Sequence, residues 1–120
     1  MTFTVEVLLR DREAVVTDSM EVGDREPAVW TDDDVRHVLE SMLQTIAHVK
    51  DPAGERRRPV SLRGLSWIVD TVAGGVMIAI EIPTGAVVAG PFAMAQERLD
   101  AMVARVIAAG GAPAARPTVH

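Results

Sequence analysis

The chain lacks cysteine and tyrosine and contains few aromatic residues of any kind. Aromatic side chains make up 3% of its 120 residues, so a core has to be built from Val, Ile, Leu, Met and Ala. Without cysteine there are no disulfides, thiolate nucleophiles or cysteine-bound metal and iron–sulfur centres. With 48% hydrophobic residues, the chain is still able to bury a core without such cross-links.

Basic residues are also scarce, and only one of the 12 is a lysine, Lys50. The formal net charge is −5, whereas binding nucleic acid requires a basic face that neutralises phosphates. No apolar run in the sequence reaches the roughly 20 residues that cross a bilayer as a helix, and the N-terminus lacks signal-peptide features. We therefore expect a soluble, cytoplasmic protein with no nucleic-acid or membrane partner.

The one long apolar stretch, residues 65–88, is cut by turn residues into strand-sized pieces. The turns are marked by two glycines at 74–75 and by Pro-Thr-Gly at 83–85. In the middle piece every second residue is β-branched, which predicts a strand with one buried face. These residues are Val76, Ile78, Ile80 and Ile82. The stretch predicts a three-stranded meander at the centre of a sheet.

The first strand of this meander has a helical alternative. Apolar residues in 61–73 also fit one helix face, with Ser61 as its cap. Gly64 in the interior and the β-rich sequence that follows it favour a strand over 65–72.

The N-terminal residues predict a hairpin. Apolar and polar residues alternate over 3–9, and a second, weaker strand pattern covers 14–22. Because the polar break between them is short, we expect the two strands to pair. Residues 23–27 then form a loop by composition.

A complete set of helix-start signals precedes residues 32–50. Thr31 and Asp34 have the spacing of a capping box, and three consecutive aspartates suit the positive end of the helix dipole. Trp30 and Val35 occupy the two positions of a hydrophobic staple. Apolar residues then recur at helical spacing, which predicts a helix over 32–50.

A second helix is predicted to begin at Gly90-Pro91, because proline suits the first helical position, and to end at Gly110. Its apolar stripe consists of Phe92, Ala95, Leu99, Met102, Val103 and Val106. The composition of 110–120 predicts a flexible tail after a single domain over 1–109. The order β-β-α-β-β-β-α predicts an α+β two-layer sandwich of about five mainly antiparallel strands and two amphipathic helices.

Four residues in or beside the meander form the candidate ligand-binding site: Arg63, Trp67, Asp70 and Glu81. Asp70 and Glu81 each interrupt an apolar strand, and would form a buried acid pair if they faced each other across the hairpin. The alternative is that both point to the solvent face of the sheet.

A run of arginines is the candidate anion-binding site, since each guanidinium offers a planar pair of donors. The run consists of Arg56, Arg57 and Arg58. The alternative is an ordinary solvated loop. His37 and His48 lie eleven residues apart and not at the i, i+4 spacing of a metal-binding pair. We expect no metal, no cofactor and no catalytic residues.

If both helices cover one face of the sheet, the other face keeps apolar residues such as Met77 and Ala79. An exposed apolar face indicates a partner, often a second copy of the chain. We therefore predict a non-enzymatic interaction module, a homodimer or a binder of another protein, such as an adaptor, a chaperone-like protein or an inhibitor of a basic partner. The alternative is a small-molecule-binding domain or enzyme with a pocket near Trp67, Asp70 and Glu81.

Overall fold

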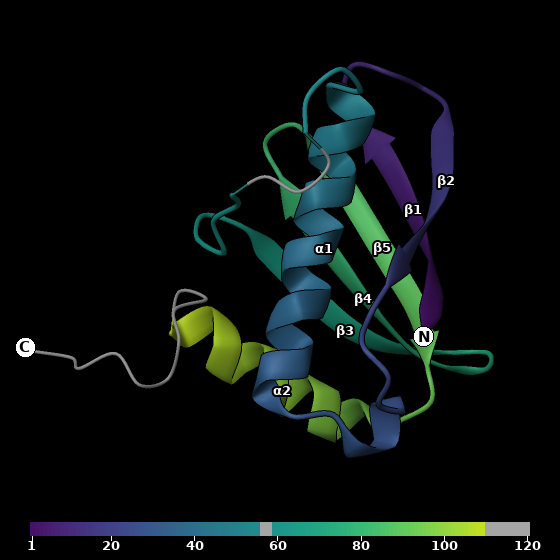
Figure 1. Cartoon of the computed structure of the whole chain (residues 1–120), viewed down its shortest axis with the longest axis vertical. Helices are drawn as coiled ribbons and strands as arrows, with labels where there is room; N and C mark the ends of the chain where they lie inside the picture. Colours follow the sequence, from purple (N-terminus) through teal and green to yellow (C-terminus); the bar gives the residue numbers. More distant parts are fainter. Residues whose placement is uncertain (56–58, 110–120) are drawn as a thin grey trace, which may run out of the picture.

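The computed structural model describes residues 1–55 and 59–109 and confirms the α+β fold within them. A five-stranded antiparallel sheet forms one layer, and two helices pack on one of its faces (Figure 1). The elements are β1 (Thr2–Leu9), β2 (Val15–Glu21), the 3-10 turn η1 (Pro27–Val29), α1 (Asp32–Lys50), β3 (Ser66–Val72), β4 (Gly75–Ile82), β5 (Gly85–Phe92) and α2 (Gln96–Ala108). The predicted tail lies outside the described residues.

The strands lie in the order β2-β1-β5-β4-β3. The N-terminal hairpin and the meander both form as predicted, and residues 66–72 are a strand. The meander does not occupy the centre of the sheet, because β1 pairs with β5, the last meander strand. The central strand is therefore β5, whereas β3 and β2 are the two edges.

The core lies between the helices and the sheet face that they cover. Side chains from alternate positions of each strand point into it, as the period of two predicts. They include Val5, Val7, Leu9, Met20, Val69, Val76, Ile78, Ile80, Val87 and Ala89. The apolar stripe of α1 buries Val35, Leu39 and Met42 completely, so the predicted buried face of this helix is correct.

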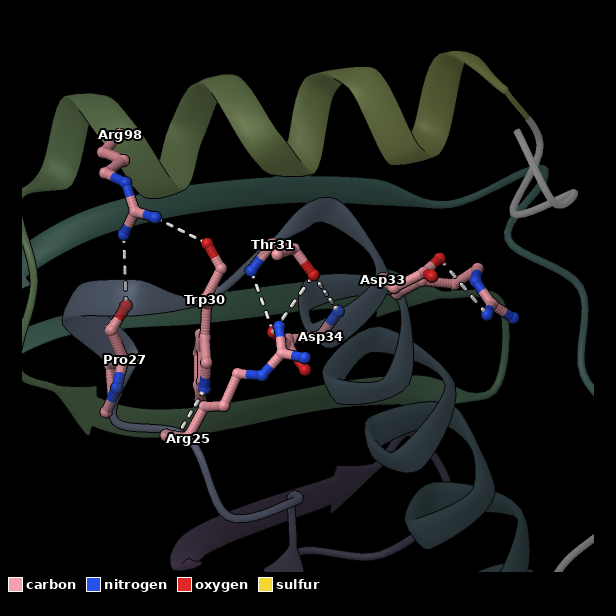
Figure 2. Close-up of polar contacts among 8 residues, drawn as sticks. Arg25, Pro27, Trp30, Thr31, Asp33, Asp34 and Arg98 are labelled. Carbon is pink, nitrogen blue, oxygen red and sulfur yellow. Dashed lines mark hydrogen bonds and ion pairs between the residues drawn. The ribbon is translucent and has the colours of Figure 1, made fainter. Parts of the chain in front are cut away.

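The start of α1 also has the predicted cap. The Thr31 hydroxyl accepts the N–H of Asp34 at 3.4 Å, and the Asp34 carboxylate accepts the N–H of Thr31 at 2.9 Å (Figure 2). Trp30 and Val35, the two staple residues, are 2% and 0% exposed. The Trp30 indole donates to the carbonyl of Arg25 at 3.1 Å, which satisfies its polar atom within the core.

The second helix begins at Gln96, so the predicted start at Pro91 is wrong. Gly90 and Pro91 remain in β5, where the β4–β5 register shifts. The strand continues because Phe92 is fully buried and its ring packs 5.1 Å from that of Trp30. Phe92 therefore belongs to the sheet, whereas the later residues of the predicted stripe are buried in α2. These are Leu99, Met102, Val103 and Val106.

Two arginines of α2 tie this helix to the start of α1. The Arg98 guanidinium donates to the backbone carbonyls of Pro27 and Trp30 (Figure 2). Arg105 forms two parallel hydrogen bonds to the Asp32 carboxylate, at 2.8 and 2.9 Å. The hydrogen bonds from Arg105 hold the pKa of Asp32 below its ordinary value.

We expect Asp32→Asn to destabilise the protein at neutral pH and to have a shrinking effect as the medium becomes acidic. A carboxyl whose pKa is lowered by folding adds stability above its unfolded pKa, and loses it as the pH falls through the folded value. The difference in urea midpoint between wild type and variant should therefore close as the pH falls below about 3.9. Asp33→Asn is the control, because Asp33 is 78% exposed and contacts only Arg36, at 3.5 Å. An equal Asp32→Asn difference at pH 7 and in strong acid would contradict this reading.

Candidate interaction surface

The second face of the sheet has no helix over it in the described part of the chain (Figure 1). We call it the open face. The strand register assigns to it the side chains that alternate with the core residues. These are Thr4, Glu6, Leu8, Val15, Thr17, Ser19, Ser66, Ile68, Asp70, Val72, Met77, Ala79, Glu81, Ala86 and Val88, with Thr2 and Glu21 at one corner.

Apolar side chains run across the open face from one edge strand to the other. Val15, Leu8 and Ile68 are 53%, 44% and 58% exposed, which is high for side chains of this size. Between them the central strand contributes the small side chains Ala86 and Val88, which are half-buried by their neighbours. Each of the five strands therefore presents at least one apolar side chain on this face, in contact with solvent.

Two shallow hollows lie on this face, and each has one glutamate in its lining. The larger, of about 210 Å³, lies over β3, β4 and β5 and includes Ala79, Glu81 and Ala86. The smaller, of about 150 Å³, lies over β1, β4 and β5 and includes Glu6 and Val88. The face thus combines apolar hollows with carboxylates.

Every charged side chain on the open face is acidic. These side chains are Glu6, Glu21, Asp70 and Glu81. Glu21 accepts hydrogen bonds from the N-terminal amino group at 2.9 Å and from the Thr2 hydroxyl at 2.6 Å, and these contacts lower its pKa. Glu6 and Glu81 have no hydrogen bond or ion pair with any described residue. The five described strands contain no basic residue, and the N-terminal amino group, a cation at this corner, is already paired with Glu21. Glu6 and Glu81 are therefore acceptors without a cation beside them in the described part of the chain.

The edge of β2 is blocked in part by an aspartate. Val22 donates to the Met1 carbonyl at 2.8 Å, and the alternation of an antiparallel pair then directs the N–H of Ser19 away from β1. The Asp18 carboxylate accepts that N–H at 2.7 Å. A strand approaching this edge would lose a donor that it needs for pairing.

The opposite edge, β3, is blocked by similar means. The Asp70 carboxylate accepts the N–H of Thr71 at 2.9 Å. From α2, Gln96 donates to the Val69 carbonyl at 2.9 Å and accepts from the Thr71 hydroxyl at 2.8 Å. Side chains therefore occupy backbone groups on both edges, which disfavours the addition of further strands.

The predicted ligand-site residues are dispersed. Asp70 and Glu81 are both exposed on the open face, but Asp70 pairs with Met77 and Glu81 with Ser66. They are offset by four residues, roughly 13 Å at ~3.3 Å per residue, so the buried acid pair does not form. Both carboxylates point to solvent, as the alternative interpretation holds.

The other two members of that site lie elsewhere. Trp67 points to the helix-covered side of β3, and Arg63 is exposed in the loop before it. A pocket between helix and sheet containing all four residues is therefore absent from the described part of the chain, although Trp67 and Glu81 both line the larger hollow. The candidate anion site at 56–58 lies outside the described residues.

Two residues of the open face were missed by sequence reasoning. Leu8 is an apolar residue at a polar position of an alternating strand, and this break in period was the available signal. Glu6 follows the expected alternation, and only the register places it beside Val88. The edge contacts of Asp18 and Gln96 had no sequence signal, because they depend on which strands become edges.

Other hollows lie beside α1. A polar groove of about 420 Å³ lies between α1 and β2. An apolar hollow of about 290 Å³ lies between α1 and the end of β4, with Lys50 in its lining. No three His, Asp or Glu side chains among the described residues gather to hold a metal ion.

The chain matches no protein-family model, and neither the curated proteins nor the solved structures contain a similar one. Neither described helix is both long and apolar enough to cross a membrane. The function therefore has to be argued from the open face itself.

Proposed function

We propose that this protein is a cytoplasmic interaction module that binds another polypeptide across its open face. The observation that carries the proposal is the uncovered apolar sheet surface, on which Leu8 and Ile68 are 44% and 58% exposed. Monomeric proteins seldom leave a contiguous apolar sheet face in water, and such patches usually mark interaction sites.

The free energy available on the open face is consistent with binding. Completing the burial of a half-exposed Ile or Leu side chain contributes about 1 kcal/mol. Burying four such side chains contributes several kcal/mol; they are Val15, Leu8, Ile68 and Met77. The free-energy cost of association is of similar order. This balance supports a partner that is held reversibly, such as an adaptor's target or an inhibited protein. A second copy of the chain is the other candidate for this surface.

The small-molecule alternative has less support. The larger hollow, which Trp67 and Glu81 line, has a volume of about 210 Å³ and is shallow. Pockets for small organic ligands usually measure roughly 300–1,000 Å³ and enclose most of the ligand.

Photo-cross-linking in the host cell tests the proposed function. A photoreactive phenylalanine analogue in place of Ile68 is expected to form an adduct with a polypeptide. The same analogue in place of Ala104, an exposed residue of α2, should form none, because that position lies on the opposite side of the molecule. Adding Val88→Lys to the Ile68 variant should abolish the adduct, because it puts a charge in the middle of the apolar side chains. The thermal unfolding midpoint should stay nearly unchanged, because the new lysine lies opposite Glu6.

The mass of the adduct identifies the class of partner, either a second copy or a different chain. Equal cross-linking from positions 68 and 104, or none from 68, would refute the proposal.

A further inference from the structure

We infer that the partner of the open face is a cationic amphipathic helix and not a second copy of this chain. This inference rests on the proposed function and names the chemistry of its partner.

The unpartnered carboxylates of the open face lie on both sides of its central strand. Glu6 lies opposite Val88, and Glu81 lies opposite Ala86, on the two sides of the central strand β5. Each glutamate belongs to one of the two apolar hollows. A ligand lying along β5 would therefore have an acceptor on either flank. Lysine and arginine suit this arrangement, because their aliphatic stems cover apolar surface while their charged ends reach outward.

The spacing of the two hollows matches the spacing of side chains on one face of a helix. The larger includes Ala86, and the smaller includes residues 88–91, which lie two to five residues further along β5. The middle of this range is offset from Ala86 by roughly 12 Å at ~3.3 Å per residue. Apolar side chains two helical turns apart, at i and i+7 or i+8, are about 10–12 Å apart. One face of a single helix can therefore place a side chain in each hollow.

The charge of the open face disfavours a second copy of the chain as its partner. In a symmetric dimer each partner presents the same surface to the other. Two open faces in contact would bring acids to acids, since the strands carry no basic residue in the described chain. Burial would then leave Glu6 and Glu81 without a cation, and unpaired buried carboxylates are costly. A basic partner removes this cost.

The occupied backbone groups on the two sheet edges disfavour a partner that adds a strand. On β2, Asp18 occupies an outward N–H, and on β3, Asp70 and Gln96 occupy outward backbone groups. A partner that needs those groups competes with bonds already made. A helix satisfies its own backbone and requires only the side-chain surface.

A pair of model peptides tests the inference. The first is a peptide of about 18 residues, roughly 27 Å long as a helix, with leucine at i, i+3, i+4 and i+7 and lysine on the flanks of that stripe. The second has every lysine replaced by glutamate. Fluorescence anisotropy at about 0.1 M salt, where the Debye length is about 10 Å, should show the basic peptide binding with a Kd below about 100 µM. The acidic peptide should not bind.

Two charge-reversal variants supply the matched comparison. Glu6→Lys with Glu81→Lys alters the open face, and Glu97→Lys with Asp100→Lys makes the same change of net charge on exposed positions of α2. We expect the open-face pair to raise the Kd of the basic peptide by about tenfold or more. This variant should bind the acidic peptide instead. The α2 pair should change the Kd of the basic peptide by less than about threefold, because its charges are screened at that distance.

Three results would overturn the inference: no binding of the basic peptide, equal loss in both charge-reversal variants, or equal binding of a scrambled peptide that has the same composition but no apolar stripe. Circular dichroism and thermal unfolding establish that each variant is folded. The cross-linking experiment separates this inference from the proposed function. An adduct of two identical chains from position 68 would reject the cationic helix and keep the interaction module, whereas no adduct would reject the module.

Discussion

Trp30→Ala is expected to destabilise the protein by about 4 kcal/mol, a large part of the stability of a domain of this size. Trp30 is 2% exposed and contacts both phenylalanines, with ring centroids 5.7 Å from Phe3 and 5.1 Å from Phe92. These rings join β1, β5 and the start of α1. Truncation leaves a cavity among three elements and removes one of the two staple residues. Urea unfolding followed by circular dichroism measures the loss.

Trp67→Ala is the matched control, because it removes the same side chain from a less buried position. Trp67 lies on edge strand β3 and is only partly buried against the core. We expect less than half the loss seen for Trp30→Ala, since much of the removed surface already contacts water. Equal losses would mean that the aromatic cluster around Trp30 is not a centre of the core.

Local sequence signals were sufficient for most elements. The cap at Thr31 and Asp34 and the helical spacing after it predict α1 with both of its ends, because these signals act within a few residues. The alternation along 3–9 and 76–82 predicts β1 and β4 for the same reason. These parts of the fold follow from short-range geometry.

Boundaries that depend on tertiary contacts could not be predicted. Gly90-Pro91 has the composition of a helix start, but the burial of Phe92 beside Trp30 keeps these residues in β5. The pairing of β1 with β5, which makes β5 central, joins residues about 80 positions apart, such as Val5 and Ala89. Packing energy overrides local propensity at such sites.

The uncovered sheet face was predicted in kind and not in detail. Met77 and Ala79 lie on the uncovered face, as the composition of the meander indicates. The sequence left open whether Asp70 and Glu81 face each other or point to solvent, because this depends on register, and the observed register separates them. The acidic character of the whole face emerges only when Glu6 is brought beside β5 by the β1–β5 pairing. A sequence pattern gives the two faces of each strand, whereas the strand order decides which faces join.

The two faces of this sheet therefore differ in composition and in what covers them. The covered face has β-branched side chains and takes up both helices, while the open face has small side chains on β5 and carboxylates on either side of it. Side chains occupy both edges, so that growth of the sheet is disfavoured while its flat face stays accessible. This division is consistent with the interaction module that we propose.

Gly85→Ala is expected to destabilise the protein by more than about 3 kcal/mol and to remove partner binding with it. Gly85 pairs with Leu9 of β1 and Ile82 of β4, at the join between the hairpin and the meander. A Cβ at this position would overlap the carbonyl oxygen of Leu8. Because the obstacle is backbone, β1 and β5 would have to separate, and the Leu8 side chain would shift on the open face. Urea unfolding and peptide anisotropy report the two losses.

Gly64→Ala is the matched control for this steric argument. Gly64 has a positive φ of 71°, and a Cβ there would meet nothing within 4 Å. It should cost about 1–2 kcal/mol from backbone conformation alone, and peptide binding should persist, because the loop before β3 is distant from β5. If the two substitutions destabilise equally, the close approach of β1 to β5 does not limit stability. If Gly85→Ala unfolds the protein while Gly64→Ala loses only about 1–2 kcal/mol and keeps peptide binding, the β1–β5 junction is what holds the open face together.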